Sequence, residues 1–349
     1  MSFIQIHVLQ EFPASNPNRD DTGRNKSVFF GDAERLRISS QCLSRNLRTN
    51  SDFSQKLQQE NVPSTRTMRL SRIVKEACEK LSVDDATGDV IALKILEAFE
   101  GKKKNKTDEN DASALMFISG AEIENIENIV ASAKELTDVN ELVVSIDDVC
   151  NSVDKSIDMA FWGRMFASNP QYNRSGAMQV AHAFTTGRSL VDYDYFTAVD
   201  DLNNSSESGS AHLGERSFGS GLYYIYACID MNLLIKNLDG DEELAKEWAA
   251  IMVQSFVSIS PTGHSTSFGP PPLAEYIRVE RGTSAPSSLA NAFSKSSVGK
   301  NDLNASIDAL EEKAEQVNSM HDTNPRYDDV LTVKTGQNSI SAISEFIKG

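Results

Sequence analysis

Hydrophobic residues alternate with polar ones in four short segments of the chain. In two segments between these, the hydrophobic residues recur at helical spacing instead. The alternation predicts strands at 3–10, 177–185, 218–229 and 273–280. The helical spacing predicts helices at 40–49 and 242–259. In chain order these segments form a βαββαβ pattern, which is that of a ferredoxin-like α+β fold. Some RNA-binding domains are also built on a small sheet with helices.

Two regions outside this pattern predict further helices. Residues 54–156 contain several apolar stripes at helical spacing, which indicate a helical insertion into the strand-based domain. Directly after them, residues 157–166 predict one more strand. Residues 303–317 predict a helix that packs outside the sheet, and the tail predicts a short helix after it.

Residues 35–48 carry the clearest candidate for a binding surface. Leu36 and Ile38 alternate with Arg35 and Arg37, which predicts a short strand with one buried and one basic side. A helix follows directly, and its polar residues at i, i+3, i+4 and i+7 share one face. These residues are Gln41, Ser44, Arg45 and Arg48.

The start of this helix has the chemistry that a phosphate backbone needs. Ser39 or Ser40 can supply the N-cap hydroxyl. We expect free amides and the positive end of the helix dipole to lie beside the arginines. The alternative is a capped amphipathic helix whose arginines are only solvated, with Leu43 and Leu47 on its buried face.

The loop from Pro13 to Gly23 is rich in proline and asparagine and contains Asn18, Arg19, Asp20 and Asp21 in succession. Two adjacent carboxylates suggest a metal site. Without further ligands, however, the pair is more typical of a solvated loop in which the aspartates orient Arg19.

Residues 189–214 form a second informative segment, because a loop of about 25 residues in a compact domain is usually functional. Tyr193, Tyr195 and Phe196 precede a polar tip. Exposed aromatic side chains of this kind stack on or wedge between bases. The alternative is a hairpin whose aromatic side chains fold back on its own sheet.

Charge and cysteine content narrow the class of protein. The net charge of −16 argues against nucleic-acid binding by the simplest rule. Residues 19–48 nevertheless carry seven Lys/Arg against four Asp/Glu, a local +3, whereas residues 121–160 carry ten acids against two lysines, a local −8. The four scattered cysteines suit a reducing cytoplasm, and no segment approaches the roughly 18 apolar residues of a membrane span.

A group of short motifs occurs in the order that one family shows. The motifs are Ile4-x-Ile6-His7-Val8-Leu9, Asn18-Arg19-Asp20-Asp21, Arg37-Ile38-Ser39-Ser40-Gln41, Gly163-Arg164-Met165, Gly176-Ala177-Met178 with Ala181-His182-Ala183, Phe196-Thr197-Ala198-Val199-Asp200-Asp201, Gly209-Ser210-Ala211-His212-Leu213-Gly214 and Leu289-Ala290-Asn291-Ala292-Phe293. On these residues the chain resembles CasC, the crRNA-binding backbone subunit of type I-E CRISPR Cascade, within the RAMP superfamily. The resemblance spans residues 1–295 and is weak across the helical insertion and from residue 296 onward.

The resemblance implies an RRM-like palm with a helical fingers insertion and a β-hairpin thumb. The thumb would be 189–216 and the fingers 54–176. The palm would comprise 1–53, 177–188 and 217–295, and C-terminal helices would occupy 296–349.

The resemblance also implies an RNA-binding set, carried by the helix, the loop before it and the thumb. Met165 and Phe196 would wedge beside a base that the thumb displaces. Tyr195 stands where relatives have tryptophan, and Ser44 stands where they have lysine, which removes one phosphate contact. The set is Asn18, Arg19, Ser39, Ser40, Gln41, Ser44, Arg45, Arg48, Met165, Tyr195, Phe196 and His212.

The partners implied are crRNA, target DNA through the guide, other Cascade subunits and further copies of the chain in a filament, typically hexameric. We expect no membrane, no cofactor, no metal and no catalysis. One alternative is a RAMP-type ribonuclease, which would need a histidine near a second base or a lysine beside the scissile phosphate, or a metal on Asp200 and Asp201. None of the five histidines, His7, His182, His212, His264 and His321, has a partner nearby in sequence. A helical protein-binding adaptor would leave the arginine stripe unexplained.

Overall fold

The computed structural model describes residues 3–60, 64–101, 112–150, 155–198, 212–263, 265–321 and 326–349. The chain divides into two compact units. The sheet unit comprises Met1–Phe53, Met178–Asn232 and Lys246–Gly349, and the helical unit comprises Ser54–Ala177 and Leu233–Ala245.

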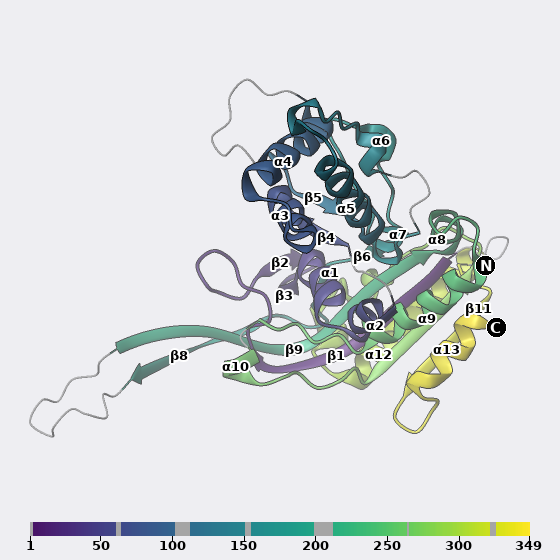
Figure 1. Ribbon diagram of the computed structural model, residues 1–349. Helices are drawn as coiled ribbons and strands as arrows, with labels where there is room; N and C mark the ends of the chain where they lie inside the picture. The colour runs from purple at the N-terminus through teal and green to yellow at the C-terminus, as the bar shows by residue number, and fades with distance from the viewer. Residues whose placement is uncertain are drawn as a thin grey trace, which may run out of the picture. The chain divides into compact units, whose positions relative to one another are not determined.

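A nine-stranded sheet forms the centre of the sheet unit (Figure 1), and its neighbouring strands are antiparallel. Its main path is β11-β10-β1-β9-β7-β3-β2, with β6 and β8 also paired to β9. The strands are β1 (Phe3–Ser15), β2 (Ser27–Phe30), β3 (Ala33–Ile38), β6 (Met178–Val180), β7 (Ala183–Thr185), β8 (Leu190–Ala198), β9 (His212–Asp230), β10 (Tyr276–Gly282) and β11 (Asp329–Lys334). The prediction of a fold that mixes helices and strands is confirmed, and the observed sheet is antiparallel.

Strand β1 lies in the middle of the sheet because its side chains are suited to burial on both faces. Ile4, Ile6 and Val8 are buried on one face, and Gln5, His7 and Leu9 are buried on the other. Antiparallel pairing places Ile6 opposite both Ala227 of β9 and Val279 of β10.

Helices cover the sheet on both faces. Helix α12 (Leu303–Met320) packs Leu310 and Ala314 into a buried cluster with Leu9 and Tyr224. Helix α9 (Glu242–Val257) contributes Trp248 to the core, where the centroid of its ring lies 5.5 Å from that of Phe53. The remaining helices that begin or lie in the sheet unit are α1 (Ser40–Thr49), α8 (Met231–Asn237), α10 (Ser265–Phe268), η3 (Ala290–Phe293), α11 (Ser296–Gly299) and α13 (Ile340–Lys348).

A charged cluster is buried between β10 and Arg326, which precedes β11. Glu280 of β10 accepts hydrogen bonds from Arg326 at 2.7 Å and from Arg278 at 2.7 Å. Burial by itself would raise the pKa of Glu280, but the positive charges of Arg326 and Arg278, which both donate to it, outweigh burial and lower that pKa to about 2. Burial lowers the pKa of His7. The cluster therefore attaches the C-terminal region to the sheet.

The helical unit has its own core. Leu70, Val74, Ile91 and Ile126 are fully buried within it, as the apolar stripes predicted. Its elements, with α2 beginning in the sheet unit, are α2 (Asp52–Glu60), β4 (Thr65–Thr67), α3 (Leu70–Leu81), α4 (Asp85–Glu100), β5 (Met116–Ile118), α5 (Gly120–Lys134), η1 (Val139–Glu141), α6 (Ile146–Val149), α7 (Ile157–Trp162) and η2 (Pro170–Tyr172). No helix among the described residues is long and apolar enough to cross a membrane.

Two local predictions are wrong. Residues 157–166 do not form a strand, because Ile157–Trp162 is the helix α7 and a turn follows at Gly163. Every residue from Ile157 to Phe161 is buried, and an apolar run this short does not distinguish a helix from a strand. Arg35 does not lie on a basic outer side either, since its side chain is fully buried.

Candidate nucleic-acid interface

Helix α1 begins where β3 ends, and Ser39 is its N-cap. The Ser39 hydroxyl accepts a hydrogen bond from the amide of Cys42 at 3.3 Å. Leu43 and Leu47 are fully buried, so the opposite side of the helix is presented outward. The predicted cap and buried face are confirmed, and Ser39 rather than Ser40 is the capping residue.

The first amides of α1 are mostly occupied, which corrects the expectation that they are free. The amide of Ser39 donates to Asn18 Oδ1 at 2.9 Å. The amide of Ser40 donates to His182 Nδ1 at 2.9 Å. With Cys42 bonded to the cap, the amide of Gln41 is the first-turn N–H for which the described residues supply no acceptor.

His182 is a residue of this site that the sequence did not single out, although it lies in the motif Ala181-His182-Ala183. Its pKa is lowered by partial burial and by the nearby charges of Arg37 and Lys26. A neutral ring that accepts at Nδ1 carries its proton on Nε2. His182 therefore braces the start of α1 as an acceptor, and it remains exposed.

The outward face of α1 holds the predicted polar stripe. Gln41 and Arg45 are exposed, whereas Ser44 and Arg48 are half-buried. The RNA-binding role of these four residues stays a prediction.

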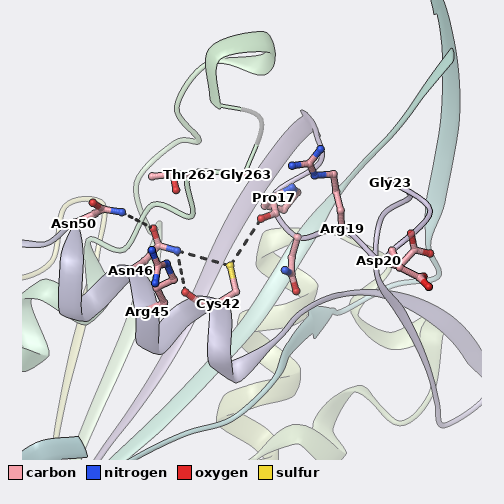
Figure 2. Close-up of a pocket in the computed structure, with 12 residues that line it drawn as sticks. Pro17, Arg19, Asp20, Gly23, Cys42, Arg45, Asn46, Asn50, Thr262 and Gly263 are labelled. Atoms are coloured by element: carbon pink, nitrogen blue, oxygen red, sulfur yellow. Dashed lines mark hydrogen bonds between the residues drawn. The ribbon is translucent and has the colours of Figure 1, made fainter. Parts of the chain in front are cut away.

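Beside α1 lies a pocket of about 480 Å³, which we call the α1 pocket (Figure 2). Asn46 is a buried lining residue and donates to the carbonyl of Cys42 at 2.9 Å. Burial raises the pKa of the Cys42 thiol, so this side chain is a neutral wall at physiological pH. The lining residues are Pro17, Asn18, Arg19, Asp20, Asp21, Gly23, Cys42, Arg45, Asn46, Asn50, Thr262 and Gly263.

The loop opposite α1 is held by Asp20. Its Oδ1 accepts from the Thr22 hydroxyl at 2.8 Å, from the Thr22 amide at 2.9 Å and from the Arg24 amide at 2.9 Å. These bonds, first the one from the Thr22 hydroxyl, lower the pKa of Asp20. Asp20 thus acts as a turn-forming acceptor. Arg19, its neighbour in the chain, is exposed and lines the pockets on both sides of this loop. Among the described residues, no group of three or more metal-ligating side chains is present.

A second pocket of about 370 Å³ lies at the root of the β8–β9 hairpin, and we call it the hairpin-root pocket. It shares Arg19 and Gly23 with the α1 pocket, so the two adjoin. Together they bring four arginines from distant parts of the sequence to one surface: Arg19, Arg24, Arg45 and Arg216. The lining residues of the second pocket are Asn16, Arg19, Thr22, Gly23, Arg24, Tyr193, Glu215, Arg216, Ser217 and Phe268.

The β8–β9 hairpin extends beyond the rest of the sheet (Figure 1) and pairs from Leu190 with Ser220 to Ala198 with His212. Tyr195 is 64% exposed. Phe196 instead lies beneath the Arg216 guanidinium, 4.4 Å from the ring centroid. It also packs over Gly214, where a Cβ would come within 2.4 Å of the ring.

Both alternatives for the hairpin aromatic residues therefore occur. Tyr193 and Tyr195 are exposed, whereas Phe196 folds onto its own strands. Residues 199–211, including Asp200 and Asp201, lie outside the described residues, as does the side chain of His212.

Met165 belongs to the helical unit and is 79% exposed. The residues on either side of Met165 fix the turn that carries it. Arg164 is buried, donates to Glu122 at 2.5 Å and lies 4.5 Å above the ring of Phe166. Gly163 has φ +69 and would place a Cβ 2.6 Å from the carbonyl of Arg174. An exposed methionine on a fixed turn suits the predicted wedge, which stays a prediction.

Comparisons with known proteins place the chain in a family. The sequence profile of the CT1975-like protein family matches residues 4–346. A solved structure titled "CRISPR RNA-guided surveillance complex, pre-nicking" has a chain with a TM-score of 0.84 and 25% identity, covering 99% of both chains. Another, "CRISPR RNA-guided surveillance complex", gives a TM-score of 0.74 and 22% identity over 99% of both chains, and supports the fold. None of the curated proteins matches the chain.

These findings confirm the resemblance to the CasC family that the motifs indicated. The match runs through the helical insertion and the C-terminal region, where the motifs gave little signal. The chain belongs to the CT1975-like protein family.

Proposed function

We propose that this protein is the non-catalytic backbone subunit of a type I-E CRISPR Cascade complex, which binds the guide crRNA without regard to sequence. The observation that carries the proposal is the pair of adjoining pockets, where four arginines converge between α1 and the root of the β8–β9 hairpin. Family membership and the match to a chain of an RNA-guided surveillance complex support it.

The chemistry of the pockets favours a phosphate backbone over a small ligand. Arginine forms charge-assisted, forked hydrogen bonds with phosphate oxygens. Arg19 and Arg45 are exposed on facing walls of the α1 pocket, so a strand lying between them would be contacted from both sides. Contacts of this kind position a strand without reading its bases.

The sheet supports an RRM-like palm whose RNA path differs from that of an ordinary RRM. The order β10-β1-β9-β7, with α1 and α9 in the connections, is that of a βαββαβ domain. An RRM stacks bases on the open face of its sheet. Here α12 covers the face that carries Leu9 and Tyr224. We infer that RNA lies beside the sheet, along α1 and the root of the hairpin.

Filament formation follows from the hairpin in this proposal. The β8–β9 hairpin reaches past its own sheet, so a second surface is needed to cover it. The next copy on the same crRNA would supply that surface, in a filament that is typically hexameric. Segments of guide left accessible between copies would pair with target DNA. Other Cascade subunits would cap the filament in the cytoplasm.

The proposal assigns no reaction to this chain. His182, at the start of α1, accepts a hydrogen bond from the Ser40 amide through Nδ1. Asp20 accepts the hydrogen bonds that form its own turn. Neither arrangement presents an acid–base pair to a scissile phosphate. RAMP-type RNA cleavage is the outcome that would displace this assignment.

Isolation of the protein from cells that carry a CRISPR array tests the proposal. Bound nucleic acid is extracted, treated separately with RNase and DNase, and sized. We expect RNA of discrete length in several-fold molar deficit to protein, because many copies share one guide. Protein free of nucleic acid, or bound to DNA alone, would contradict the proposal. Incubation of the same preparation with labelled RNA and Mg²⁺ should yield no cleavage products.

A further inference from the structure

The helical unit has two ends of opposite charge that the proposed function does not use. Strands β4 and β5 pair with each other, and α3 and α5 begin shortly after them. Lys134 in the last turn of α5 donates to the carbonyl of Leu81, the last residue of α3, at 2.8 Å. The starts of α3 and α5 therefore lie at one end of the unit, and their C-terminal ends lie together at the other.

The first end is basic and carries exposed apolar side chains. Met68 follows β4 and is 45% exposed, and Leu115 precedes β5 and is 60% exposed. Both adjoin the last pair of the β4–β5 ladder, so they lie side by side. The guanidinium of Arg66 lies 4.7 Å from the ring centroid of Phe117. We call this surface the basic end, and its exposed residues are Arg66, Met68, Arg69, Arg72 and Leu115.

The second end, where α4 also begins, is acidic and carries the side chain of Leu136, which is 40% exposed. Lys134 and Lys80 lie there too, but both are bonded within the unit. Lys134 donates to the carbonyl of Leu81, and Lys80 donates to Glu127 at 2.5 Å. We call this surface the acidic end, and its exposed residues are Glu79, Asp84, Asp85, Glu135, Leu136 and Asp138.

The charges of the two ends do little to stabilise the unit that carries them. A helix dipole favours acidic residues at the start of a helix and basic residues at its end. Arg69 is instead the N-cap of α3, whose first turn contains no acidic residue, and Glu135 is the C-cap of α5. The 12 residues of α3 separate the ends by about 18 Å, which exceeds the Debye length of about 8 Å at physiological salt. The two ends are therefore better placed to attract a second molecule than to attract each other.

We propose that the basic end of one copy docks on the acidic end of the next copy, so that helical units of consecutive copies associate head to tail. A head-to-tail contact that does not close into a ring extends with each added copy. This inference rests on the proposed function, in which the crRNA aligns the copies. It adds a protein interface that neither the guide nor the hairpin provides.

A second copy fits the two ends better than a nucleic acid does. A phosphate backbone would pair with the arginines of the basic end but would leave Met68 and Leu115 exposed, and the acidic end would repel it. A second copy instead brings Leu136 to the two apolar side chains, inside a rim of opposite charges. Apolar side chains gathered within a polar rim are typical of protein contacts. Ends of like charge repel, so the charges also set the direction of association.

Two charge-reversal variants of the full chain test the docking. Arg69→Glu with Arg72→Glu gives a copy with two acidic ends, and Glu79→Lys with Glu135→Lys gives a copy with two basic ends. All four changes place charges as the helix dipoles prefer, so we expect both variants to fold. The protein concentration for half-saturation is measured on an oligouridine octamer and on an oligouridine of guide length.

Two control variants carry the same changes in charge on the sheet unit. Lys334→Glu with Lys348→Glu matches the first variant and lies on β11 and α13, whereas Asp308→Lys with Glu315→Lys matches the second and lies on α12. All four residues are exposed. The controls remove the effect of net charge on RNA binding from the comparison.

The wild type should half-saturate the long RNA at a concentration lower than that for the octamer by about 10-fold or more. Each charge-reversal variant alone should lose this advantage and bind the octamer as its control does. An equimolar mixture of the two variants should regain the advantage, because the acidic ends of one then meet the basic ends of the other. Both controls should keep the wild-type advantage.

The outcomes separate this inference from the proposed function. The docking is refuted if either variant alone keeps the advantage, or if the mixture fails to regain it. Loss of octamer binding by Arg69→Glu with Arg72→Glu, but not by its control, would show that the basic end binds nucleic acid instead. If the wild type binds the octamer and shows no advantage on the long RNA, the docking is refuted and backbone binding stands. If the wild type binds neither RNA, the proposed function is refuted and this inference with it.

Discussion

Arg35 joins the two sides of the interface, and its replacement by methionine tests how they are held together. From β3, which runs directly into α1, its guanidinium donates to the carbonyls of Thr185 at 3.0 Å and Thr186 at 2.7 Å. Further bonds reach the carbonyls of Gly187 at 3.3 Å and Phe293 at 2.8 Å. The segment 185–187 leads into β8, so one buried side chain connects α1, the hairpin and η3.

The expected cost follows from these contacts. Hydrogen bonds to a charged group are worth about 1.5–3 kcal/mol each, but four bonds made by one group are not additive. The methionine leaves these buried carbonyls without their donor, at a cost of about 1–3 kcal/mol for each carbonyl that stays unsatisfied. We therefore expect Arg35→Met to lower the free energy of unfolding of the sheet unit by about 3–5 kcal/mol, since the four losses add only in part. With a urea m-value of about 2–3 kcal/mol/M, the midpoint should fall by more than about 1 M.

The assay is urea unfolding followed by tryptophan fluorescence in a Trp162→Phe background. The remaining Trp248 is 2% exposed and lies in the sheet unit, so the signal reports on that unit alone. Arg37→Met is the matched control, because Arg37 is half-buried and its guanidinium makes one hydrogen bond among the described residues, with His182 at 3.3 Å. We expect it to cost less than about 1 kcal/mol. Equal effects of the two substitutions would refute the role given to Arg35.

Three further predictions concern pH, the hairpin and the exposed methionine. Because burial lowers the pKa of His7, the unfolded chain binds a proton near pH 6.5 that the folded chain resists. Stability should therefore fall as pH drops below about 6.5, and urea midpoints at pH 7.5 and 5.5 should differ less in His7→Gln than in the wild type. Gly214→Ala should displace the Phe196 ring, which a new Cβ would approach within 2.4 Å, and near-ultraviolet circular dichroism should record the change. Gly163→Ala, at φ +69, should raise protease cleavage next to Met165, whereas a cleavage pattern like that of the wild type would show that the turn is not strained.

The sequence predicted the strands and helices whose side chains show a clear period. β1, α1, α9 and α12 are examples, because each buries a regular set of apolar positions. The predictions failed where the period was uninformative. The six-residue helix α7 is too short to show one, and the edge strands β2 and β11 bury few side chains and were missed.

The site was partly visible for a similar reason. The polar stripe of α1 and its cap are local, so the spacing of residues reveals them. The burial of Arg35 depends on carbonyls about 150 and 258 positions away. Other hydrogen bonds of the site also join segments that are distant in the sequence. The first amides of α1 donate to Asn18 and His182, and the Asn16 side chain donates to the carbonyl of Ser217. No local pattern contains that information.

The salt dependence of RNA binding by the wild type and by Arg45→Ala tests the central claim most directly. On single strands each phosphate contact contributes about 0.7 to the slope of log affinity against log salt concentration. Arg45→Ala should flatten the slope by about that amount on oligouridine and oligoadenine alike. The exposed Lys334 on β11 lines neither pocket, and Lys334→Ala should leave the slope unchanged. A slope unaffected by Arg45→Ala, or a shallow slope with strong preference for one sequence, would contradict the account.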